Sequence, residues 1–72
     1  MSLIPIQINT WYNCIPNDLN GNVELCMIRR PVIPYPGWII VTYYDGREVY
    51  SGKLKECIKW VHDHYTERRY YN

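Results

Sequence analysis

The pattern of apolar and polar positions is clearest between residues 37 and 65. Residues 38–44 form a run of β-branched and aromatic side chains, which is typical of a half-buried strand. Asp45-Gly46 follows, and such a pair between two apolar runs indicates a tight hairpin, because both central residues of its turn need positive φ. Residues 47–50 are then the returning strand.

A two-residue loop would place Thr42 opposite Val49, and Val41 opposite Tyr50. The two faces of the hairpin then carry two apolar sets: Ile39, Val41, Tyr43 and Tyr50 on one face, and Trp38, Ile40, Thr42, Tyr44 and Val49 on the other. Both faces are apolar enough to need cover, and we expect the first to face the core.

Ser51-Gly52 ends the hairpin, and a helical period begins. The apolar positions Leu54, Cys57, Ile58, Val61 and Tyr65 have the spacing of one helix face. Glu56 can act as the acidic member of a capping box with Lys53 at its start, or Ser51 can cap the helix instead.

The upstream half predicts less regular strands. Residues 3–8 alternate, with Pro5 placing them at a sheet edge, and residues 10–15 continue as a second strand or as the bent end of the first. A cluster of turn-forming residues at 16–22 precedes a strand at 23–29, with Leu25 and Met27 on one side. Residues 30–37, with three prolines, form an extended connector. The pattern predicts a single α+β domain over residues 1–72, with an antiparallel sheet of three or four strands and one C-terminal amphipathic helix packed on a face.

Composition narrows the classes of function. The 72 residues include 8 Tyr and 3 Trp but no Phe, and the formal net charge is +1. Tyr and Trp are enriched at protein interfaces, although half-exposed positions in a small core also favour Tyr. The small net charge argues against strong non-specific DNA binding, which depends on phosphate neutralisation.

The cysteines Cys14, Cys26 and Cys57 are odd in number, and we identify neither a signal peptide nor an apolar run long enough to span a membrane. We therefore expect a cytoplasmic protein with no membrane partner. Cys57 lies on the apolar helix face as a small core residue. Cys14 and Cys26 flank the turn near Asn20, and whether they form a disulfide is left open.

The sequence shows no pattern typical of a catalytic or metal site. His62 and His64 would point about 200° apart on a helix, so they cannot share one metal ion. Nothing near a cysteine supplies a base and an orienting group, and the isolated glycines form no phosphate loop. We expect no catalytic residues, no metal and no cofactor, and hence no enzyme.

A second line of residues on the predicted helix suggests a binding surface. Trp60, His64 and Tyr71 follow one another at helical spacing, beside Arg68, and we add Tyr44 and Arg47 at the hairpin tip. The competing interpretation is that Trp60 closes the core over the sheet edge. If these residues instead form a binding surface, we expect contact with an unidentified host protein, or a homodimer in which a sheet edge and this helix face are covered.

The alternative is a small sequence- or structure-specific nucleic-acid-binding protein. Its candidate residues are Lys53, Lys55, Lys59 and Arg69. A small sheet with one packed helix occurs in several DNA-binding domains, in which the sheet or a turn enters a groove.

Residues 44–61, YDGREVYSGKLKECIKWV, resemble short, mostly uncharacterised proteins of phages and mobile elements. The shared pattern is an aromatic residue, an Asp-Gly turn, a short strand, and then a helix with an acidic start and an apolar-Trp stretch. The resemblance covers about a quarter of the chain and supplies no catalytic residues. It implies a non-enzymatic protein that binds, and often inhibits, a host macromolecule.

Overall fold

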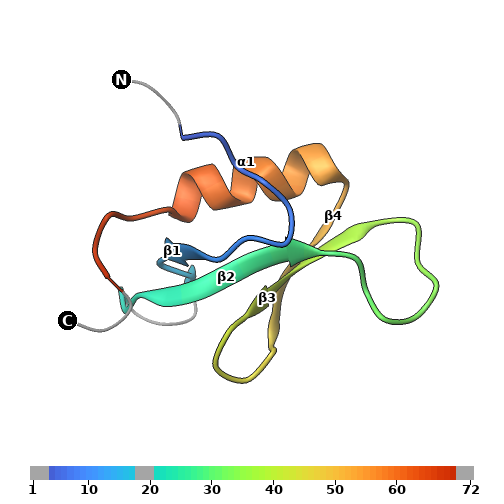
Figure 1. Ribbon diagram of the computed structural model, residues 1–72, viewed down its shortest axis with the longest axis horizontal. Coiled ribbons are helices and arrows are strands. Elements are labelled where there is room, and N and C mark those ends of the chain that lie inside the picture. Colours follow the sequence, from blue (N-terminus) through green and yellow to red (C-terminus); the bar gives the residue numbers. More distant parts are fainter. Residues whose placement is uncertain (1–3, 18–20, 70–72) are drawn as a thin grey trace.

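The computed structural model describes residues 4–17 and 21–69. Its elements, in chain order, are β1 (Tyr12–Cys14), β2 (Glu24–Arg29), β3 (Trp38–Thr42), β4 (Glu48–Gly52) and α1 (Leu54–His64). The strands form one antiparallel sheet in the order β1-β2-β3-β4, and α1 packs on one face of it (Figure 1). The predicted α+β fold is therefore confirmed.

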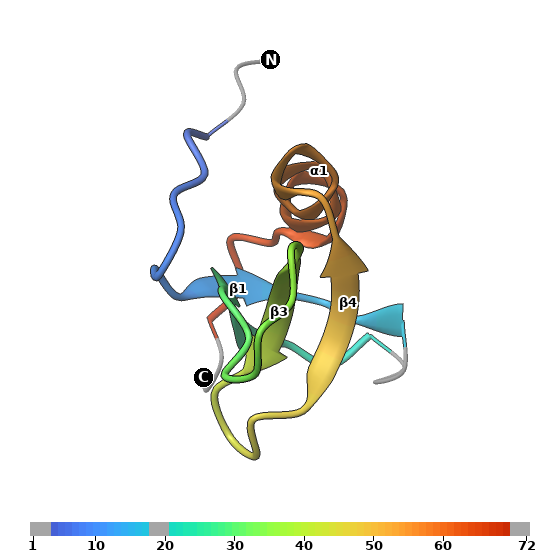
Figure 2. The same cartoon turned by 90° about the vertical axis from the view of Figure 1, so that its right-hand side faces the viewer.

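The core lies between α1 and the sheet. Among the described residues, its fully buried hydrophobic cluster comes from β1, β2, β3 and α1 and comprises Cys14, Cys26, Ile28, Ile40, Cys57 and Val61. Figure 2 shows α1 end-on above the strands, with the β3–β4 loop pointing away from it. The helix residues Cys57 and Val61 confirm the apolar stripe predicted from the sequence.

The β3–β4 hairpin differs from the predicted register. Ile40 pairs with Tyr50 and Val41 with Glu48, so Val49 is an extra residue that forms a β-bulge. The physical reason lies in the loop. The Thr42 hydroxyl donates to an Asp45 carboxylate oxygen at 2.6 Å and accepts the Arg47 N–H at 3.0 Å, which closes a loop wider than two residues.

The predicted core face of the hairpin was also wrong. Ile40 and Thr42 are buried towards α1, whereas Ile39 and Val41 lie on the opposite side of β3 and stay partly exposed. Tyr50 pairs with Ile40 and packs against the core. It was predicted to share a face with Val41, but the bulge places the two side chains on opposite faces of the sheet. The alternation predicted for β2 holds: Cys26 and Ile28 are buried, whereas Leu25 and Met27 are only partly buried.

The predicted strand at residues 3–8 is not present in its described part, residues 4–8. Pro5 cannot donate to a ladder, and Asn9 has a left-handed φ of 57°, which turns the chain before β1 begins. The Gln7 N–H is satisfied by the Tyr12 hydroxyl at 2.8 Å instead of by a strand. Residues 10–15 do supply a strand, but only three of them.

The helix begins after Lys53, whose N–H donates to the Glu56 carboxylate at 3.1 Å. Glu56 therefore has its predicted capping role, whereas Ser51 belongs to β4. The helix ends before Tyr65, which has an extended backbone and pairs with Cys14. Within the described ranges, the structure contains no helix with the length and apolar character needed to cross a membrane.

Candidate functional site

The predicted aromatic surface on α1 is partly assembled. The Trp60 indole and the His64 imidazole stack with ring centroids 3.9 Å apart and planes 15° apart. The His64 Nδ1 lies 2.7 Å from the Trp60 carbonyl oxygen, a hydrogen bond that requires a proton on Nδ1. Tyr50 lies beside the indole at 6.4 Å between centroids. The Trp60 and His64 side chains thus form a stacked pair, and each is only partly buried.

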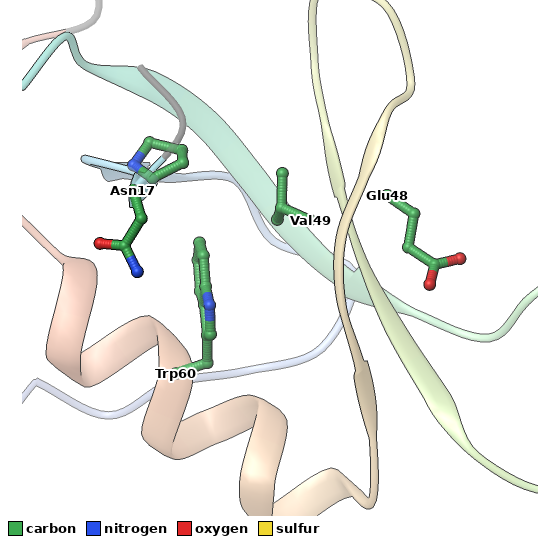
Figure 3. Close-up of a pocket in the computed structure, with 5 residues that line it drawn as sticks. Asn17, Glu48, Val49 and Trp60 are labelled. Atoms are coloured by element: carbon green, nitrogen blue, oxygen red, sulfur yellow. The ribbon is translucent and has the colours of Figure 1, made fainter. Parts of the chain in front are cut away.

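A shallow hollow adjoins this pair. It has a volume of about 210 Å³ and is lined by Pro16, Asn17, Glu48, Val49 and Trp60. In Figure 3 the indole rises from α1 towards Asn17 and Val49, while Glu48 points away on the other side of β4. Trp60 also packs against the core. Both interpretations of Trp60 thus apply in part, because it helps to close the core and still borders an open hollow.

The other predicted partner-binding residues are placed separately. Arg68 donates to the Gly21 carbonyl, and Arg47 contacts the carboxylates of Glu24 and Asp45 at 3.6 Å and 3.4 Å. Tyr44 is 81% exposed in the β3–β4 loop, and this loop points away from α1. Tyr71 lies outside the described residues.

The predicted nucleic-acid residues do not form a purely basic surface. Lys53, Lys55, Lys59 and Arg69 are all exposed. The Lys59 ammonium, however, bonds the Asp63 carboxylate at 2.8 Å. This contact raises the pKa of Lys59 and lowers that of Asp63. Carboxylates therefore interrupt the basic side chains along α1.

A further group of partly exposed and exposed apolar side chains lies on the sheet face opposite α1. We call this the open face and define it by Leu25, Met27, Ile39 and Val41 at its centre, Trp11 and Tyr43 at one end, and Ile33 and Tyr35 at the other. The central four are partly exposed. The Trp11 and Tyr43 rings meet edge to face at 5.2 Å and remain 38% and 58% exposed.

The second end of the open face has a groove. Ile33 and Tyr35 of the proline-containing connector border a hollow of about 240 Å³ together with Ile39 and Ser51. Sequence reasoning detected that both hairpin faces are apolar, but it favoured the helix as the exposed surface. The signal that could have found the open face is that one helix covers only one side of a sheet.

The reactive groups of the chain are shielded. The three cysteines are free and buried. A hydrogen bond with Cys14 and burial strongly raise the pKa of the Cys26 thiol, and burial with the nearby Glu56 carboxylate raises that of Cys57. Protonated, buried thiols are poor nucleophiles. Among residues 4–17 and 21–69, no cluster of three or more His, Cys, Asp or Glu side chains could hold a metal ion.

Comparison of the chain with protein-family models, with curated proteins and with solved structures gave no match.

Proposed function

We propose that this protein is a small, non-enzymatic binding protein that docks a protein partner on the open face of its sheet. The carrying observation is that the centre of this face is apolar and that its two ends carry exposed aromatic and aliphatic side chains. Exposed rings and β-branched residues that meet in one area are unusual on a monomer and often mark an interaction site. The partner we propose presents an apolar surface of its own.

The distribution of charge favours a protein over a nucleic acid. By strand alternation, the open face carries only Arg29 and Glu48 as charged strand residues, and they have opposite signs. Phosphate binding requires several clustered basic side chains. The lysines proposed for that role lie instead at the start of α1 and along its exposed side, across the sheet from the open face.

Nucleic-acid binding remains the second candidate because of one observation. The exposed rings of Trp11, Tyr43 and Tyr44 could stack on the bases of a single strand. Such binding would weaken steeply with added salt, whereas apolar docking would not. Inhibition of a host protein, which the resemblance to phage and mobile-element proteins implies, would be one consequence of protein docking.

Affinity capture from a host lysate with matched baits tests the proposal. The wild-type chain is compared with Val41→Lys, which places a charge at the centre of the open face, and with Lys55→Glu, which changes an exposed lysine on α1. We expect a protein captured by the wild type and by Lys55→Glu to be lost with Val41→Lys. Circular dichroism of each bait controls for folding.

Three outcomes would oppose the proposal. Retention of the partner by Val41→Lys would move the site off the open face, and a loss only with His64→Ala would place it at the Trp60–His64 pair. Recovery of oligonucleotides in a salt-sensitive manner, with loss on Lys55→Glu, would favour the nucleic-acid function.

A further inference from the structure

The two edges of the sheet are not equivalent. The outer side of β1 is already occupied by the chain that follows α1: the Ile15 N–H donates to the His64 carbonyl at 2.8 Å, and the Thr66 N–H donates to the Asn13 carbonyl at 2.9 Å. The outer side of β4 has no strand beside it within the described part of the chain. An uncovered edge presents backbone N–H and C=O groups that another strand can pair with.

The hydrogen bonds of β3 show which N–H and C=O groups of β4 point away from the sheet. The Tyr43 N–H donates to the Leu25 carbonyl, and the Thr42 N–H donates to the Arg47 carbonyl. Because these groups alternate along an antiparallel strand, odd-numbered β3 residues bond β2 and even-numbered ones bond β4. Ser51 lies opposite Ile39, so its N–H and C=O point away from β3 and out from the edge.

A second copy of the same chain fits this edge. With a two-fold axis through Ser51, the two serines exchange both backbone bonds, and each Tyr50 lies opposite Gly52 of the other copy, where there is no side chain to clash. Past the bulge at Val49, Glu48 then lies opposite Lys53 of the second copy. Lys53 still has an extended backbone, with φ −72° and ψ 157°. Its N–H already donates to the Glu56 carboxylate and its C=O accepts the Cys57 N–H, so Lys53 contributes its side-chain ammonium to the contact and no backbone bond.

This register has charge complementarity. Glu48 and Lys53 are both exposed, and the symmetry of the pair forms the Glu48–Lys53 contact twice. We propose that the chain forms a symmetric homodimer through its β4 edge, giving one continuous eight-stranded sheet with both helices on the same face. Because β1 is already covered, association through edges would stop at two copies. The dimer does not depend on docking at the open face, because it leaves the central residues Leu25, Met27, Ile39 and Val41 uncovered. Ser51 and Glu48, however, belong both to the dimer edge and to the groove at one end of that face.

A third hollow lies beside the proposed dimer edge. A recess of about 340 Å³ lies on the helix side of the β4 edge, lined by Tyr50, Glu56, Lys59, Trp60 and Asp63. A second copy joined at β4 would bring its own helix towards this recess. The predicted aromatic surface of α1 would then be turned towards the dimer contact.

Sedimentation equilibrium of the full chain at micromolar to millimolar concentrations tests the proposal. We expect the apparent mass to rise from 8.7 kDa towards twice that value. Reversing one charge with E48K or K53E should weaken association by about tenfold, because two surface pairs become repulsive. The E48K/K53E double variant should restore it. Arg69→Glu makes the same kind of charge change at the C-terminal end and should leave association unchanged.

Two further measurements locate the contact. Hydrogen exchange of the Ser51 amide should slow with rising concentration, and Ser51→Pro, which removes an N–H that β3 does not use, should abolish association. A monomer at millimolar concentration would overturn the proposal. A dimer whose affinity ignores both single reversals and shows no change in Ser51 exchange would also overturn it, since a different surface would then be in contact.

Discussion

The contact between Glu24 and Arg47 offers a sharp test of the packing. Glu24 is only 7% exposed at the start of β2, and its Oε2 lies 3.6 Å from an Arg47 guanidinium nitrogen. Its other oxygen, Oε1, is buried and has no hydrogen-bond partner among the described residues. Burying an ionised carboxylate is costly unless a positive charge lies close to it, and Arg47 supplies that charge. We therefore predict that Arg47→Met strongly destabilises the fold.

The magnitude follows from the burial of the two partners. Removing one member of a fully buried ion pair costs about 3–5 kcal/mol. Here the Arg47 side chain is 33% exposed, so water screens part of the interaction, and we expect about 2 kcal/mol from the loss of this contact. That is a large part of the roughly 5 kcal/mol available to a domain of this size. Arg47 also bonds Asp45, so the single variant loses more than one interaction.

A double-mutant cycle isolates the pair. Glu24→Gln removes the charge that Arg47 compensates, so Arg47→Met should cost about 1–2 kcal/mol less in that background. The free energy of unfolding is measured by urea titration at neutral pH, followed by tryptophan fluorescence. Equal costs of Arg47→Met in both backgrounds would show that the two side chains do not interact, and the argument from the buried carboxylate would fail.

Three other predictions use the same measurement. The pKa of Asp45 is lowered chiefly by the hydrogen bond from Thr42, so the stability it contributes is present above the pKa of the unfolded chain and is lost as pH falls through the folded value. Acidification below about pH 4 should therefore destabilise the wild type more than Asp45→Asn, and equal losses would contradict the assignment. Gly46→Ala should cost about 1 kcal/mol, because Gly46 has φ +67° while nothing lies within 4 Å of an added Cβ; no cost would mean that the loop adopts another conformation. Val61→Ala should cost about 2 kcal/mol by leaving a cavity under α1, whereas a negligible change would show that this part of the helix does not pack on the core.

The helix and its role were predictable because their signal is local and repeated. Leu54, Cys57, Ile58 and Val61 recur at helical spacing, and Cys57 and Val61 are the residues of α1 that become fully buried. Glu56 caps the first turn through a backbone bond that any residue at position 53 except proline can supply. Helical spacing is a local signal that does not depend on distant parts of the chain, so the helix could be predicted from these residues alone.

The hairpin register was not predictable from its turn residues alone. An Asp-Gly pair indicates a two-residue loop, but the Thr42 hydroxyl competes with the backbone for Asp45 and for the Arg47 N–H. The loop widens, and Val49 becomes the extra residue of a bulge. A side chain three positions before the Asp-Gly pair therefore changed the β4 partner of each β3 residue.

The N-terminal segment and the exposed surface were harder to predict, because both depend on tertiary contacts. The edge strand expected at residues 3–8 requires a neighbour along its whole length, but Asn9 turns the chain away from the sheet. Trp60 and His64 were predicted to lie together and do so. The open face was missed because its residues alternate with buried ones on the same strands, and only the position of α1 distinguishes the two sides.

The bulge at Val49 connects the proposed binding face with the proposed dimer edge. Without it, Glu48 and Tyr50 would point to the same side of β4, since alternate residues share a face. With it, Glu48 turns away from α1 while Val49 and Tyr50 both pack towards the core. Glu48 is thereby free to pair with Lys53 of a second copy, beside an open face that stays nearly uncharged. Deleting Val49 should therefore change both surfaces together, whereas K53E, which alters no residue of the open face, should weaken only the dimer.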